Sequence, residues 1–154
     1  MNHTFTIRSF VPKSFLITAA LTLGVAGFVG LVDAQVKKGK SRPLTTGQLM
    51  KGTIKPHCEG IKKGLDANPA DDKAWAEIAL HAAILNEATY TLMDDGRCPD
   101  GVWADATTKA MRDGSADVLK AVEAKDVAAG KAAFGAMTRS CKACHDKHKE
   151  KDKK

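Results

Sequence analysis

Apolar residues recur at three- and four-residue steps along most of the chain beyond residue 43, and no useful stretch alternates with a period of two. This spacing is typical of amphipathic helices and predicts helices but no strand. The expected helices cover approximately residues 46–65, 69–93, 102–124 and 126–148. Short connections between neighbouring helices predict an all-α fold, an antiparallel up-down-up-down four-helix bundle.

Several residues mark where these helices begin or weaken. Asn68 is the expected cap of the second helix, with Pro69 in its first position, and Asp126 is the expected cap of the fourth. Pro56 lies inside the first helix and removes a backbone donor, so a kink or break is expected there. Gly114 is a weak point of the third helix.

The first 34 residues differ in kind from the rest. A positively charged start precedes an uncharged, mostly apolar run over residues 14–32, and small residues lead up to Ala34. This pattern predicts a secretory signal peptide cleaved after Ala34, a polar linker over residues 35–43 and one domain over residues 44–154. The alternative is an uncleaved anchor, because the apolar run is just long enough to span a bilayer. Both alternatives predict export, and we expect a periplasmic protein.

The chain is basic, with a formal net charge of +6, and much of the excess lies in residues 37–42 and 147–154. Such blocks can bind nucleic acid, but an exported protein rarely meets any, so no nucleic-acid partner is expected. We expect the blocks to be solvated tails or a docking surface for an acidic redox partner protein.

The C-terminal region contains one C-x-x-C-H motif, made by Cys141, Cys144 and His145. In this motif the two thiols bond to the vinyl groups of one porphyrin, and the histidine becomes the proximal iron ligand. The three residues share one face of a helix. A thioredoxin-like pair would need a strand–helix context, and a zinc site that added His148 would crowd four ligands into two helical turns. The motif therefore predicts one covalently attached haem c.

Two cysteines, Cys58 and Cys98, remain outside the motif. In an oxidising compartment a leftover pair most often forms a disulfide, which we therefore predict. Cys58 lies roughly 18 Å along the first helix, so the bond requires either a loop around Cys98 that folds back or a helix that breaks at Pro56.

Three stretches carry a likeness to a known family: DGVWADA at residues 100–106, AAFG at 132–135 and SCKACHD at 140–146. They resemble the class II c-type cytochromes, the cytochrome c prime family, which are four-helix bundles with haem attached near the C-terminus. The likeness spans roughly residues 101–149. It implies the same fold and cofactor, and it also suggests a homodimer through the early helices.

The N-terminal half departs from this resemblance. Family members usually carry an arginine in the first helix, four residues before the distal position, near a haem propionate. Four residues before Met50 this chain has Thr46, so that contact is not carried over. Cys58 and Cys98 are also outside the usual pattern.

The antiparallel bundle places the haem at the end where the first helix starts. The residues expected at that end are Met50, Tyr90, Met93 and Trp103. Met50 is the expected sixth iron ligand, because a thioether opposite histidine raises the reduction potential, although methionine also serves as core filler. His57 is the alternative ligand, about 10 Å further along the helix unless Pro56 redirects it. His81 is expected to be satisfied or partly exposed, and His148 to be solvated.

These ligand alternatives lead to two functions. With Met50 and His145 both on the iron, the protein carries one electron between exported redox partner proteins. With Leu49 or Ile54 over the iron instead, it binds a small gas such as nitric oxide, as five-coordinate members of the similar family do. We expect no enzymatic activity, because no paired carboxylates or distal acid–base group is placed over the iron by the sequence.

Overall fold

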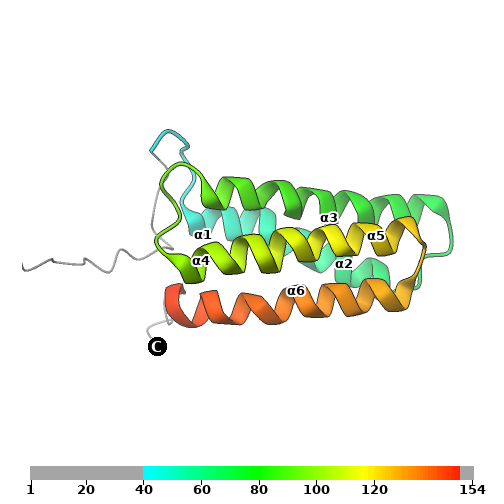
Figure 1. Cartoon of the computed structure of the whole chain (residues 1–154). Coiled ribbons are helices and arrows are strands. Elements are labelled where there is room, and N and C mark those ends of the chain that lie inside the picture. The colour runs from blue at the N-terminus through cyan, green and yellow to red at the C-terminus, as the bar shows by residue number, and fades with distance from the viewer. Residues whose placement is uncertain (1–39, 150–154) are drawn as a thin grey trace, which may run out of the picture. The chain divides into compact units, whose positions relative to one another are not determined.

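The computed structural model describes residues 40–149. The predicted signal peptide, most of the predicted linker and residues 150–154 lie outside the described residues. Within residues 40–149 the chain forms four antiparallel helices and no strand, as the periodicity predicts (Figure 1). None of these helices is long and apolar enough to cross a membrane.

The first and third helices each contain a π-helical segment between two α-helical ones. The first helix consists of α1 (Thr46–Leu49), η1 (Met50–Ile54) and α2 (Lys55–Asp66). The second helix is α3 (Asp72–Met93). The third consists of α4 (Gly101–Asp105), η2 (Ala106–Arg112) and α5 (Asp113–Glu123). The fourth is α6 (Val127–His148). α6 packs against α5, η2 and α2, and α3 packs against α2 and α5.

Side-chain caps start the helices. The carboxylate of Asp126 accepts the backbone N–H of Ala129, which confirms the predicted cap of α6. The predicted cap at Asn68 is wrong, because Asp71 caps α3 by accepting the N–H of Ala74. Asn68 instead adopts a left-handed conformation with φ of 51°, which ends the preceding helix. Asparagine tolerates this conformation better than most residues, so it terminates a helix here rather than starting one.

The predicted break at Pro56 does not occur, because the first helix continues through it. The turn before the proline widens into η1, where the N–H of Lys55 donates to the carbonyl of Met50, five residues back. A proline lacks the N–H of the normal ladder and clashes with the carbonyl four residues earlier, and a widened turn moves that carbonyl aside. The widened turn therefore absorbs the proline and keeps α1 and α2 in one helix.

The core is built from the apolar faces of all four helices. Fully buried members include Ile61, Leu65, Ile78, Leu85, Leu92, Val118 and Met137. Gly114, expected to be a weak point, is a site of close approach between α5 and α6. A Cβ built on it would lie 2.7 Å from the Cβ and 3.2 Å from the Cα of Met137.

Replacing Gly114 by alanine is expected to destabilise the fold by about 1–3 kcal/mol, because the added methyl meets backbone that cannot simply move away. Gly52 in η1 has no atom within 4 Å of the position that a Cβ would take, and it serves as the matched control. Gly52→Ala is expected to be neutral or to stabilise by about 0.5–1 kcal/mol. Urea unfolding of both variants measures the difference, and equal free energies of unfolding would contradict the close approach.

Candidate functional site

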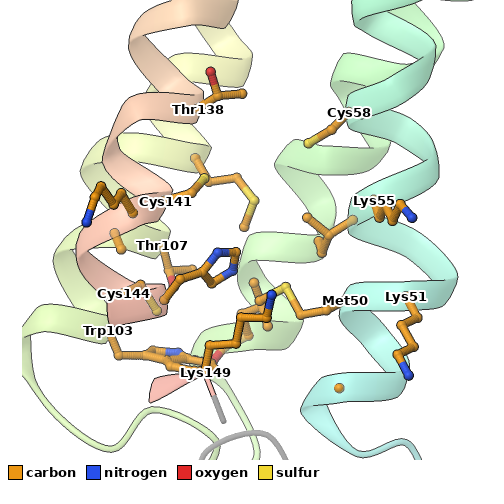
Figure 2. Close-up of a pocket in the computed structure, with 17 residues that line it drawn as sticks. Met50, Lys51, Lys55, Cys58, Trp103, Thr107, Thr138, Cys141, Cys144 and Lys149 are labelled. Carbon is orange, nitrogen blue, oxygen red and sulfur yellow. The ribbon is translucent and has the colours of Figure 1, made fainter. Parts of the chain in front are cut away.

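A cavity of about 690 Å³ opens between the first and fourth helices. One wall is the start of the first helix and the other is the last part of α6, as Figure 2 shows. α4, η2 and the adjoining end of α3 contribute the remaining lining. This volume lies in the range of cofactor and ligand sites.

The α6 wall carries the C-x-x-C-H motif. Cys141, Cys144 and His145 all line the cavity, with Cys144 buried, Cys141 half-buried and His145 exposed at the edge. Burial raises the pKa of Cys144 to about 11, with the nearby Cys141 and Asp100 adding to the effect. Desolvation, together with the charge of Lys149, lowers the pKa of His145. The imidazole is therefore neutral near pH 7 and has a lone pair available for a metal.

The opposite wall presents Met50, Ile54 and Cys58, one residue per turn. The half-buried Met50 points its thioether towards the α6 wall (Figure 2). Ile54 is 8% exposed and closes the apolar lining beside it. The structure thus brings Met50 and the C-x-x-C-H residues to one cavity, where the sequence places them.

The alternative ligand His57 does not lie in this cavity. Its Nδ1 is 2.8 Å from Nδ1 of His81 on α3, and the two rings are 5.1 Å apart between centroids. Burial, followed by the nearby His81, lowers the pKa of His57. A neutral pair can form this bond, since one ring donates and the other accepts. His57 therefore joins two helices rather than facing the cavity, and His81 is satisfied as expected.

The predicted disulfide between Cys58 and Cys98 is not formed in the structure, where neither of these cysteines is bonded to another. Neither condition for the bond is met: the first helix does not break at Pro56, and the Cys98 thiol donates locally to the carbonyl of Asp100 at 3.5 Å. Cys58 instead lines the cavity, where burial raises its pKa to about 11. The spacing of eight residues between Met50 and Cys58 places both on one helix face. The expectation that leftover cysteines of an oxidising compartment form a disulfide does not take this spacing into account.

The third helix closes the cavity with Trp103, Thr107 and Met111. Trp103 is 2% exposed, and its Nε1 donates to the carbonyl of Leu92 at 2.9 Å. Sequence reasoning misses Met111 and Leu92 as lining residues: the apolar spacing of the second helix marks Leu92 only as core, and Met111 is not among the residues expected in the core or at the site.

Tyr90, which is expected at this end of the bundle, does not line the cavity. The residue is 48% exposed, and the guanidinium of Arg112 lies 3.9 Å from the centroid of its ring. Met93 does not line the cavity either.

His148 is held in place rather than solvated, so that expectation is wrong. Its Nε2 lies 3.2 Å from Oδ1 of Asp100, and its ring meets Trp103 edge-on with centroids 5.6 Å apart. Lys147 pairs with the other carboxylate oxygen of Asp100 at 2.5 Å. These contacts, chiefly the one from Lys147, hold the pKa of Asp100 well below its usual range. We call Asp100, Lys147 and His148 the C-terminal clamp, because they fix the last turn of α6 to the start of α4.

The donor set fits a covalently attached haem. Two thiols and an imidazole lie on one helical wall, a thioether lies on the facing wall, and apolar side chains such as Ile54, Leu92 and Trp103 line the cavity between them. Cys141 and Cys144 would hold the porphyrin through its vinyl groups, and His145 would supply the proximal ligand. The iron of a bound haem would supply one-electron redox chemistry or a site for a diatomic gas.

A C-x-x-C-H motif on the last helix of a four-helix bundle, opening onto an apolar cavity, defines a c-type haem protein. The family model described as Cytochrome C' matches residues 67–149, and the chain belongs to this family. Its members bind haem c covalently, one per chain. Comparisons with curated proteins and with solved structures gave no match. The match includes the C-x-x-C-H wall but not the first helix, so Met50 and the facing wall lie outside it.

Proposed function

We propose that this protein is an exported electron carrier whose haem iron is held between His145 and Met50. The observation that carries the proposal is the thioether of Met50, which points from η1 into the cavity towards the wall that bears Cys141 and Cys144. A thioether opposite histidine favours the reduced iron and suits an electron carrier.

The chain's own residues support this role in two ways. The thiols of Cys141 and Cys144 fix the porphyrin to α6, and the C-terminal clamp holds the turn that follows His145. The two proposed iron ligands, His145 and Met50, lie on helices of one packed bundle. A site of this kind needs little rearrangement when the iron changes oxidation state.

The partners we propose are exported redox proteins with an acidic docking surface, and the location we propose is the periplasm. The support is the sequence pattern of residues 1–34 and the net charge of the full chain, +6, much of which lies in the basic blocks at residues 37–42 and 147–154. Opposite charges speed the encounter of two proteins at low salt.

A second candidate is a five-coordinate haem protein that binds nitric oxide or another small gas. The buried Ile54, which lines the same wall one turn from Met50, favours it. If Ile54 rather than Met50 covers the iron, the distal face is apolar and free for a diatomic ligand. Leu49 is buried in the core and does not line the cavity, so it does not support this candidate.

The optical spectrum of the purified holoprotein separates the two candidates. A six-coordinate site gives a low-spin spectrum with a weak long-wavelength sulfur–iron band, and the reduced form does not change on addition of carbon monoxide. A high-spin spectrum that shifts with carbon monoxide or nitric oxide would overturn ligation by Met50 and favour gas binding.

A further inference from the structure

The cavity lining is basic as well as apolar. Its charged members within the described residues are four lysines, and no aspartate or glutamate joins them. These lysines are Lys51, Lys55, Lys142 and Lys149. A haem carries two carboxylates on its propionate groups, and a carboxylate close to apolar lining needs a cationic or hydrogen-bonding partner. The four lysines are the cationic side chains of the cavity lining that could supply this partner.

Three of these lysines are poorly placed for it. The ammonium of Lys142 lies 2.5 Å from Asp146, and that of Lys55 lies 3.7 Å from Glu59. Lys51 and Lys55 also point away from the α6 wall in Figure 2. Their amines therefore face solvent rather than the cavity.

Lys149 is placed differently. It follows α6 directly, and its backbone N–H donates to the carbonyl of His145 at 3.0 Å. Its side chain reaches across the cavity mouth towards the side of Met50 in Figure 2, and its ammonium pairs with no carboxylate of the described residues. The C-terminal clamp fixes the two residues before it, because Lys147 and His148 both pair with Asp100. The position of Lys149 at the mouth is therefore set by the fold and not by a free tail.

We infer that Lys149 binds a propionate carboxylate of the haem. The ammonium forms a charge-assisted hydrogen bond with the carboxylate at the cavity mouth, and the clamp holds the backbone from which it extends. This role depends on the covalent haem and not on ligation by Met50. It makes Lys149, which the sequence pattern assigns to a solvated basic block, part of the cofactor site.

The test compares Lys149→Gln with Lys73→Gln in the holoprotein. Lys73 is exposed near the start of α3, away from the cavity, so both variants lose one positive charge but only one loses it at the cavity mouth. Spectroelectrochemical titration gives the reduction potential as a function of pH. The potential of Lys149→Gln is expected to fall below that of the unmodified protein, because a nearby cation disfavours the more positive oxidised iron. The effect at Lys73 should be negligible at 0.1 M salt, since exposed charges are screened beyond about 10 Å.

The pH dependence separates pairing from a general charge effect. An ammonium partner favours the ionised carboxylate, so its loss raises the propionate pKa and moves the inflection of the potential–pH curve to higher pH. Lys149→Arg is expected to restore the original inflection. The inference is overturned if Lys149→Gln and Lys73→Gln give the same potentials and the same inflection. The optical spectrum reports coordination separately, so a five-coordinate iron would overturn the electron-carrier proposal and leave this result interpretable.

Discussion

Met50→Ala is expected to convert the holoprotein from a low-spin haem protein that does not bind carbon monoxide into a high-spin one that binds it stoichiometrically. Met50 points its thioether into the cavity, and alanine leaves no atom that can ligate iron. Covalent attachment should persist, because Cys141 and Cys144 stand on the other wall. The reduction potential should fall, since the thioether that favours reduced iron is lost. Optical spectra with and without carbon monoxide, and a potentiometric titration, measure both changes.

Met93→Ala is the matched control. Met93 is also half-buried at the same end of the bundle, but it does not line the cavity. The Met93→Ala substitution should lower the stability of the fold and leave the optical spectrum and the response to carbon monoxide unchanged. A low-spin spectrum that survives in Met50→Ala would show that another group ligates the iron, and the electron-carrier proposal would then lose the observation that carries it.

The four helices follow from the sequence because burial imposes a period near 3.6 residues on each of them. Trp75, Ile78, Ala82 and Leu85 all occur at this spacing, and all are buried. The C-x-x-C-H wall follows for the same reason, since one helix face must carry all three residues. Local spacing along a single helix is enough for these predictions.

Features that depend on two elements at once cannot be predicted in this way. The orientation of His57 depends on His81 of the second helix, and the partner of His148 is Asp100 at the start of the third. The spacing of residues along one helix predicts which face they share, but it does not predict which side chain of the neighbouring helix they contact. The proline shows a related limit, because the widened turn before Pro56 changes backbone hydrogen bonds without changing the side-chain pattern.

The cysteines show a third kind of limit. The disulfide between Cys58 and Cys98 is predicted from the compartment and the number of leftover thiols, with geometry as a secondary condition. The structure places Cys58 on the wall of the cavity. The tendency of exported proteins to form disulfides is an average over many proteins. The position of Cys58 two helical turns after Met50 is specific to this chain and places its thiol in the cavity.

Arg97 joins the connection before α4 to the segment before α1, at the cavity end of the bundle. Its side chain is fully buried, with one guanidinium nitrogen 2.9 Å from the carbonyl of Leu44 and another 3.5 Å from Asp95. Asp95 also accepts from the backbone N–H groups of Ser41 and Arg42. Arg97 therefore anchors the stretch that leads to Asp100 and hence to the C-terminal clamp.

Arg97→Ala is expected to lower the free energy of unfolding by about 2–4 kcal/mol, because it empties a fully packed volume and removes the donor to Leu44. In Arg97→Ala, Asp95 keeps its hydrogen bonds from Ser41 and Arg42. The segment before α1 should therefore stay folded despite the lower free energy of unfolding. Arg42→Ala is the control. It removes an exposed arginine that donates to the hydroxyl of Thr91 on α3, and this substitution should change the free energy of unfolding by no more than about 0.5 kcal/mol. Urea unfolding of the holoprotein measures both.

Arg97→Met then separates packing from hydrogen bonding. Methionine keeps much of the buried stem, and it removes a guanidinium whose Nε has no hydrogen-bond partner among the described residues. The free energy of unfolding of Arg97→Met is expected to lie between that of Arg97→Ala and that of the unmodified protein. Methionine restores packing but not the hydrogen bond to Leu44. If methionine is as damaging as alanine, the hydrogen bonds rather than the volume hold this end of the bundle. If Arg97→Ala is no worse than Arg42→Ala, Arg97 does not anchor the connection, and the position of Asp100 must depend on its own contacts with Lys147 and His148.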